Sequence, residues 1–189
     1  YITLIKDKRF LGQTLIQFFA FGGFFAYISG SSFVYQNIFQ LSAQEFSYLF
    51  GLNSCGIILA SAISGRVSNV VTSRQILTFS LWQLTIGSLL FLVSMIFEWS
   101  LIPVTTILFF TACTVSLFGS ASFSMAMTKY GKMAGSASAI LGFASMFAAG
   151  IVSPIVGLGG EHTGIPMGIT MLVCAALSLL CLYGLVEKE

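Results

Sequence analysis

Few side chains in this sequence are suited to acid–base, nucleophilic or metal chemistry, and they do not cluster. The single histidine, His162, follows Glu161 in a glycine-rich polar stretch, and the four cysteines have no metal-type spacing. The apolar segments contain no aspartate or glutamate, and no serine–histidine pair of the kind that intramembrane proteases need is evident. The sequence therefore predicts no catalytic residue, no metal site and no cofactor, and a protein that is not an enzyme.

Neutral polar and aromatic side chains instead share one helical face near the start of the chain. With a turn of about 100° per residue, Gln13, Gln17, Phe24 and Tyr27 point within about 40° of a common direction. An amide that faces lipid is costly, so this face should look into a helix bundle or a watery cavity. It suits a bulky, weakly polar ligand, or it holds neighbouring helices together. Asn53 and, more weakly, the fourth-segment threonines including Thr114 receive the same two interpretations.

The elements that must position these residues are membrane spans. Of 189 residues, 57% are hydrophobic and only 7% are charged, whereas soluble domains carry about 25% charged residues. Six apolar segments are each long enough for about 30 Å of hydrocarbon: residues 10–29, 46–64, 76–97, 101–125, 134–158 and 165–186. Backbone groups in lipid must pair within a segment. We therefore expect an all-α integral membrane protein, with residues 1–189 forming a single domain of six transmembrane helices.

The charges predict how these helices are oriented in the membrane. The basic residues fall in the segments that alternate onto one side: Lys6, Lys8, Arg9, Arg66, Arg74, Lys129, Lys132 and Lys188. The opposite connections contain Glu45, Glu98 and Glu161 and no lysine or arginine. Basic loops remain on the cytoplasmic side, so both termini should be cytoplasmic, with membrane lipid as the surroundings and no nucleic-acid partner. A basic lead-in that opens with Tyr1 rather than methionine suggests part of a longer protein.

The fifth segment is unusually rich in small residues. Gly142 and Gly150 belong to rows of small residues at spacing four, which let helix backbones approach closely in lipid. Pro154 removes a backbone hydrogen bond, with Gly150 and Gly157 about one turn to either side. Plain tight packing and a bending element are both open interpretations.

Three stretches of this chain, residues 27–31, 50–53 and 134–143, carry a likeness to a known family. They resemble parts of the bicyclomycin/chloramphenicol-resistance (Bcr/CflA) type of multidrug antiporter in the major facilitator superfamily. Residues 27–31 and 50–53 are similar to its seventh and eighth helices, and residues 134–143 to its eleventh. The likeness covers nearly the whole chain but only the C-terminal half of such a transporter. In the loop motif after the eighth helix, Gly65, Asn69 and Arg74 occupy the first, the aspartate-like and the last positions, whereas Val70, Thr72 and Ser73 depart. The charges of this loop are those of Arg66 and Arg74. In the glycine–proline motif, Gly142, Gly150, Pro154 and Gly157 resemble the superfamily's antiporter pattern.

The resemblance implies a mechanism. Two six-helix halves, each a 3+3 inverted repeat, rock around a midplane site in alternating access. The expected function is proton-coupled multidrug efflux across the bacterial inner (plasma) membrane, with a lipophilic small-molecule substrate, protons and the missing N-terminal half as partners. The coupling carboxylate should lie in that half. Substrate-binding residues would be Gln13, Gln17, Phe24, Tyr27, Asn53 and Thr114, and gating residues would be Gly65, Arg66, Arg74, Gly142, Gly150, Pro154 and Gly157.

Two other functions remain open on the sequence alone. Within the superfamily, the cargo could be a sugar, an amino acid or another metabolite, because the missing half can supply charges. Outside it, the chain could be a non-transporting membrane protein that assembles with partners through its small-residue rows. An intramembrane acid in six further spans would favour antiport over either alternative.

Overall fold

A computed structural model describes residue 4, residues 7–158 and residues 163–186. Within this part of the chain, six helices are long and apolar enough to span a membrane. They are α2 (Lys8–Ser32, continued by the π-helix η1, Phe33–Ile38), α3 (Ala43–Val67), α4 (Ser73–Ile96), α5 (Leu101–Tyr130), α6 (Ala134–Gly157) and α7 (Ile165–Cys181, continued by the π-helix η3, Leu182–Val186). A 3-10 turn, η2 (Gly131–Met133), joins α5 to α6. The prediction of an all-α fold with six membrane-spanning helices is confirmed. Glu161 and His162 lie outside the described residues.

Several helices begin or end outside the apolar segments that predicted them, because polar caps determine where they start. Asp7 caps α2, and its carboxylate accepts a hydrogen bond from the backbone N–H of Arg9 at 2.9 Å. Ser42 and Glu45 cap α3 reciprocally, the Ser42 backbone N–H donating to the Glu45 carboxylate at 2.9 Å. The largest difference is in the first span, which was expected to end near residue 29 but continues as η1 to Ile38.

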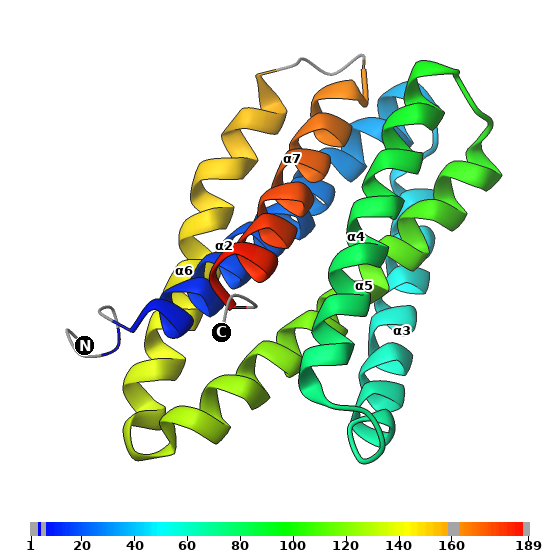
Figure 1. Cartoon of the computed structure of the whole chain (residues 1–189). Helices are drawn as coiled ribbons and strands as arrows, with labels where there is room; N and C mark the ends of the chain where they lie inside the picture. Colours follow the sequence, from blue (N-terminus) through cyan, green and yellow to red (C-terminus); the bar gives the residue numbers. More distant parts are fainter. Residues whose placement is uncertain (1–3, 5–6, 159–162, 187–189) are drawn as a thin grey trace.

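The six helices form two interlocked triplets (Figure 1). Helix α2 packs against α6 and α7, whereas α5 packs against α3 and α4. Exchanging α2 with α5, α3 with α6 and α4 with α7 converts the first set of contacts into the second. The two central helices, α2 and α5, also contact each other. This pairing is the one expected of a 3+3 repeat of helices.

The ends of the bundle differ in charge. The start of α2 and the α3–α4 and α5–α6 turns lie at one end (Figure 1), and the described lysines and arginines are all within these regions. Glu45, in the first turn of α3, and Glu98, shortly before the start of α5, lie at the opposite end of the bundle. Of the basic residues that the sequence assigned to one side, the structure thus brings the described ones together at one end.

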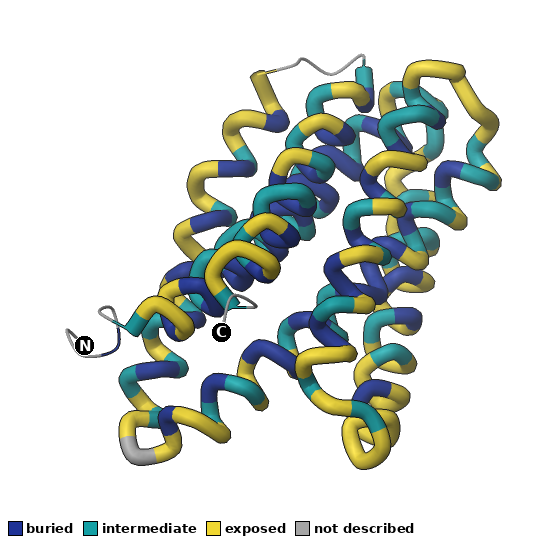
Figure 2. The backbone as a smooth tube through the Cα atoms, in the orientation of Figure 1, coloured by how far each residue is buried: buried dark blue, intermediate teal, exposed yellow. Residues whose placement is uncertain are grey.

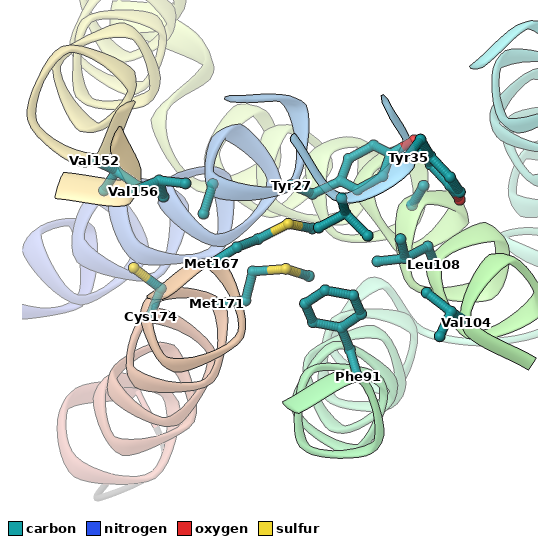
Figure 3. Close-up of a cluster of buried hydrophobic side chains, with 13 residues drawn as sticks. Tyr27, Tyr35, Phe91, Val104, Leu108, Val152, Val156, Met167, Met171 and Cys174 are labelled. Carbon is teal, nitrogen blue, oxygen red and sulfur yellow. The ribbon is translucent and has the colours of Figure 1, made fainter. Parts of the chain in front are cut away.

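Buried residues run through the middle of the bundle along α2, whereas α6 is largely exposed along its outer side (Figure 2). A core cluster near the acidic end joins five of the six helices through apolar and aromatic side chains (Figure 3). In it, Met167 and Met171 of α7 lie between Tyr27 of α2 and Phe91 of α4. Helix α3 contributes few buried residues, namely Asn53, Gly56 and Ser64. It is therefore held mainly by its contact with α5.

Candidate functional site

The polar face of α2 lies inside the bundle. Gln17 is 1% exposed, and its side-chain amide donates to the Ser145 hydroxyl of α6 at 3.3 Å. Ser145 in turn donates to the backbone carbonyl of Leu141 at 3.0 Å. The side-chain oxygens of Gln13 and Gln17 are buried and have no protein partner. A buried polar atom without a partner is costly unless something binds it, so these amides retain capacity for another hydrogen bond.

Tyr27 and Asn53 form a second polar group, where α2 meets α3. The Asn53 amide donates to the Tyr27 hydroxyl at 2.6 Å, and both residues are 2% exposed. The Tyr27 ring is stacked on Phe50 with centroids 6.3 Å apart, and the ring of Phe24 lies 5.9 Å away. Phe24 is only partly buried and packs against the core. The pair therefore combines a hydrogen bond with aromatic surface, as a weakly polar ligand would require.

Sequence reasoning missed two residues beside this pair. The Tyr35 hydroxyl of η1 is fully buried and lies near Asn53 and Thr105 of α5, but makes no hydrogen bond of good geometry. The side-chain oxygens of Asn53 and Thr105 are also buried without a partner. Tyr35 continues the Gln13–Tyr27 face at helical spacing, so extending the first span into the apolar residues after Ser32 would have found it.

Thr114 does not join either group through a side-chain bond. Its hydroxyl donates to the backbone carbonyl of Thr111 in the same helix at 2.6 Å, and the residue is 1% exposed. Thr111 itself donates to the carbonyl of Ile107 at 2.7 Å and lies against Gly87 of α4. Both threonines satisfy their hydroxyls on α5, as is common within membrane helices.

The six expected substrate-binding residues therefore do not line one open surface of this chain. Gln13, Gln17, Tyr27, Asn53 and Thr114 are each at most 5% exposed. In the observed arrangement Gln17, Tyr27 and Asn53 form side-chain hydrogen bonds between helices, whereas Thr114 bonds within its own helix. Contact of these four residues with a ligand would require helices to move apart or a cavity to open beside them.

The expected gating glycines of α6 face open space. An added Cβ at Gly142, Gly150 or Gly157 would meet no atom within 4 Å, and the same is true of Gly65 on α3. The small residues that do pack α6 against the rest of the bundle are Ala137, Ala144, Ser145 and Ala148, which are buried. The small-residue rows thus divide into one face used within this chain and one left open.

Pro154 lies inside α6, which continues to Gly157. As a proline it cannot donate the backbone hydrogen bond that would join it to Gly150. One residue earlier, the hydroxyls of Ser153 and Ser29 are hydrogen-bonded at 2.8 Å, which links α6 to α2 across this weakened turn. A bend of α6 at Pro154 would either break this hydrogen bond or move Ser29 of α2 together with Ser153.

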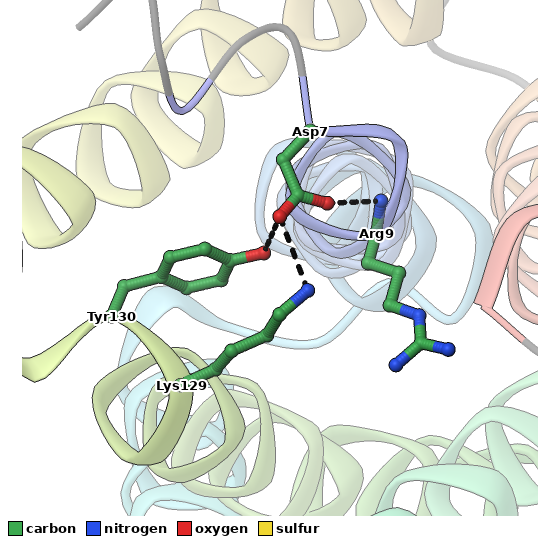
Figure 4. A network of polar contacts seen from close by, with 4 residues as sticks. All are labelled: Asp7, Arg9, Lys129 and Tyr130. Carbon is green, nitrogen blue, oxygen red and sulfur yellow. Dashed lines mark hydrogen bonds and ion pairs between the residues drawn. The ribbon is translucent and has the colours of Figure 1, made fainter.

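At the basic end, a carboxylate ties α2 to α5 (Figure 4). Asp7 accepts from the Tyr130 hydroxyl at 2.6 Å and from the Lys129 ammonium at 3.1 Å. The hydrogen bond from Tyr130, more than the nearby Lys129 charge, lowers the pKa of Asp7 from 3.8 to about 2. Arg66 and Arg74 belong to the same end of the bundle, in the last turn of α3 and the first turn of α4.

This tether yields a prediction about pH. Because the pKa of Asp7 is lower in the folded state, its stabilising effect is complete above pH 3.8 and is lost as the pH falls towards 2. Asp7→Asn should lower thermal stability slightly, by at most about 1 kcal/mol for a partly exposed ion pair. The difference in melting temperature between wild type and variant should be constant from about pH 5 to 8 and shrink in stronger acid. A difference that instead grew as the pH fell from 8 to 6 would contradict this assignment.

Six apolar helices in two interlocked triplets, with polar groups buried between them, define a multi-pass α-helical membrane protein. No protein-family model matches the chain. Over 187 residues it is 37% identical to an uncharacterized MFS-type transporter, YdgK, of Bacillus subtilis (strain 168), covering 99% of this chain and 46% of that relative. It is 25% identical over 189 residues to a bicyclomycin resistance protein homolog of Haemophilus influenzae, covering 100% of this chain and 48% of the relative.

The chain thus spans about half the length of the curated relatives that it matches. In sequence it is similar to about half of an MFS-type transporter, its six helices are long and apolar enough to span a membrane, and the expected resemblance is confirmed. The first of these relatives is named as a transporter, and the second is named for bicyclomycin resistance.

Proposed function

We propose that this chain is the C-terminal half of a proton-coupled multidrug efflux antiporter of the bacterial plasma membrane. The observation that carries the proposal is the match of the whole chain to about half of two transporter-related proteins, one named for bicyclomycin resistance. Transport of this kind needs no catalytic residue, so we also propose that the protein is not an enzyme. The basic residues gathered at one end support an orientation in which that end, and both termini, are cytoplasmic.

A second six-helix half would cover the open glycine faces of α3 and α6. Gly51 and Gly65 of α3, and Gly142 and Gly150 of α6, have no atom within 4 Å of an added Cβ. In lipid, small residues are favoured where another helix backbone must approach closely. The pseudo-symmetric positions of α3 and α6 support one partner that contacts both helices.

The proton carrier belongs to the other half. The described acidic residues Asp7, Glu45 and Glu98 all lie at helix ends rather than in the apolar interior. Asp7 has a low pKa and keeps its charge throughout the physiological range. This half contributes a scaffold, part of the drug site and one gate, in which Gly65, Arg66 and Arg74 act at the α3–α4 turn and Pro154 with its flanking glycines acts in α6.

The cargo proposed for this half is lipophilic and neutral. The described polar groups of the bundle interior are amides and hydroxyls, and several have unused hydrogen-bonding capacity. Rocking of the halves would bring Gln13, Gln17, Phe24, Tyr27, Asn53 and Thr114 into contact with it. Aromatic rings beside Asn53 supply apolar surface, as in other small-molecule sites.

Asn53 tests this site. In the full-length protein, Asn53→Ala leaves the Tyr27 hydroxyl unpaired, a cost of about 1–3 kcal/mol, and should lower drug resistance by about tenfold for at least one compound. Ser54→Ala is the matched control, because Ser54 is exposed and bonds only within its own helix. Growth in graded concentrations of several drugs is the measurement. Unchanged resistance to all of them in Asn53→Ala, at equal protein levels, would count against the site.

The function itself is tested by efflux from cells that express the full-length protein. Preloaded fluorescent drugs should leave faster than in cells without it, and a protonophore that collapses the proton gradient should abolish the difference. Efflux that persists without the gradient would exclude proton coupling, and no efflux of any lipophilic compound would favour another cargo.

A further inference from the structure

Three buried polar atoms near the acidic end of the bundle have no hydrogen-bond partner in the part of the chain that the structure describes. They are the Tyr35 hydroxyl of η1, the side-chain oxygen of Asn53 on α3 and the Thr105 hydroxyl of α5. Tyr35 is fully buried and Asn53 is 2% exposed. Because the Tyr35 side chain lies near both Asn53 and Thr105, the three atoms form one cluster, to which three separate elements contribute.

Thr105 differs from the other threonines of the described helices. Each of the others donates to a backbone carbonyl three or four residues earlier in its own helix, as is usual within membrane helices: Thr14, Thr78, Thr85, Thr106, Thr111, Thr114, Thr128 and Thr170. The Thr105 hydroxyl makes no such bond, although Leu101, four residues earlier, belongs to the same helix. It lies near Tyr35 instead, so its hydrogen-bonding capacity is left for the cluster.

Asn53 determines what kind of group can complete this cluster. Its amide nitrogen already donates to the Tyr27 hydroxyl at 2.6 Å, and its side-chain oxygen can only accept. The hydroxyls of Tyr35 and Thr105 can each donate or accept. A group that satisfies all three atoms must therefore donate to Asn53 and also bond with the two hydroxyls. A hydroxyl group does both at one oxygen, whereas a carbonyl or ether oxygen leaves Asn53 unpaired.

An apolar cavity of about 390 Å³ adjoins the cluster at Thr105. It lies between α3 and α5, and Leu49, Leu52 and Phe109 are among its lining residues. The volume is within the range of small-molecule sites, which combine mostly apolar walls with a few polar groups. Extension of this cavity past Thr105 would reach Tyr35 and Asn53, which is the kind of opening that contact of Asn53 with a ligand requires.

We propose that Tyr35, Thr105 and Asn53 select cargo molecules that carry a hydroxyl group beside an apolar body. The body would occupy the cavity between α3 and α5, and the hydroxyl group would donate to Asn53. A buried polar atom left unpaired is costly, so a molecule without a donor is disfavoured even where its apolar body fits. This inference rests on the proposed export function, and it adds Tyr35 and Thr105 to the residues that contact the cargo.

Equilibrium binding of two matched dyes to the purified full-length protein tests the proposal. One is a neutral boron-dipyrromethene dye with a primary alcohol, and the other is its methyl ether, which accepts a hydrogen bond but cannot donate one. Fluorescence polarisation should show about tenfold tighter binding of the alcohol, because the ether leaves Asn53 unpaired. Tyr35→Phe and Thr105→Val each remove one hydroxyl. Each should weaken binding of the alcohol by about fivefold and leave binding of the ether within about twofold of wild type.

Tyr48→Phe and Thr85→Val are the matched controls. Tyr48 is 69% exposed, and Thr85 donates to the Leu81 carbonyl of its own helix at 2.8 Å. Neither residue belongs to the cluster or to the lining of the cavity. Both variants should therefore bind the alcohol and the ether as wild type does.

Equal binding of the two dyes would mean that water alone completes the cluster, and it would overturn the proposal. No binding of either dye, or an unchanged preference in both Tyr35→Phe and Thr105→Val, would also overturn it. So would equal losses for the two dyes, because a merely structural role affects both alike. Export of the dyes from cells is measured separately. Selective binding of the alcohol without export of either dye would count against the proposed efflux function but not against the selective site.

Discussion

Replacing Gly142 with leucine in the full-length protein is expected to slow efflux strongly while leaving the amount of protein in the membrane unchanged. Within this chain the added side chain meets nothing, because no atom lies within 4 Å of a Cβ built at Gly142. Against a second half packed on α6, the same side chain would force the helices apart. Overpacking of that kind costs about 1–3 kcal/mol, which at an interface that must close in every cycle lowers the rate by about 5- to 150-fold.

A size series separates this effect from a change in helix stability. Alanine, valine and leucine at Gly142 should reduce efflux progressively, although alanine favours the helix more than glycine does. The same series at Gly51 of α3, which also faces open space, should give the same order. Wild-type efflux in Gly142→Leu would contradict a close partner on this face of α6.

Gly30→Leu, unlike Gly142→Leu, should reduce the amount of folded protein, whether or not a second half packs against this chain. Gly30 is buried where α2 crosses α7, and an added Cβ would lie 2.6 Å from Sδ, 2.8 Å from Cγ and 2.9 Å from Cβ of Met167. Because Cβ is the fixed base of the Met167 side chain, a rotamer change alone does not remove the clash. Helix α7 must shift within the core cluster, and we expect a melting temperature lower by several degrees and reduced membrane levels.

A double variant identifies the cause. Met167→Ala removes two of the three close atoms, so Gly30→Ala should be tolerated better in the Met167→Ala background than alone. The two substitutions should therefore couple in a thermal-unfolding cycle. Strict additivity would mean that the contact between Gly30 and Met167 does not limit how α2 and α7 pack.

Hydropathy and charge were enough to predict the six helices and the gathering of cations at one end, because both follow from the solvent that each residue can tolerate. The helix ends were less predictable. The cap formed by Ser42 and Glu45 and the π-helical extension after Ser32 depend on local hydrogen bonds, which an average over apolar residues does not register.

The sequence was enough to predict which side of the first helix is buried, but not which residues of other helices that side contacts. The spacing of Gln13, Gln17 and Tyr27 indicated a side that avoids lipid, and the three residues are indeed buried. Which residues they meet depends on the crossing of distant helices. The pairing of Gln17 with Ser145 joins residues 128 apart in the chain. Neither this bond nor the division of the small residues of α6 into a packed and an open face follows from one helix alone.

We propose that this chain crosses the membrane six times with its basic end in the cytoplasm. Single cysteines in a full-length protein whose own cysteines are replaced by serine test it directly. Asn69→Cys lies in the exposed α3–α4 turn and Ser100→Cys in the exposed α4–α5 turn. A membrane-impermeant maleimide added to intact cells should label Ser100→Cys at once and Asn69→Cys only after the cells are permeabilised. Labelling of Asn69→Cys in intact cells would contradict the orientation and, with it, the assignment of this half to drug export.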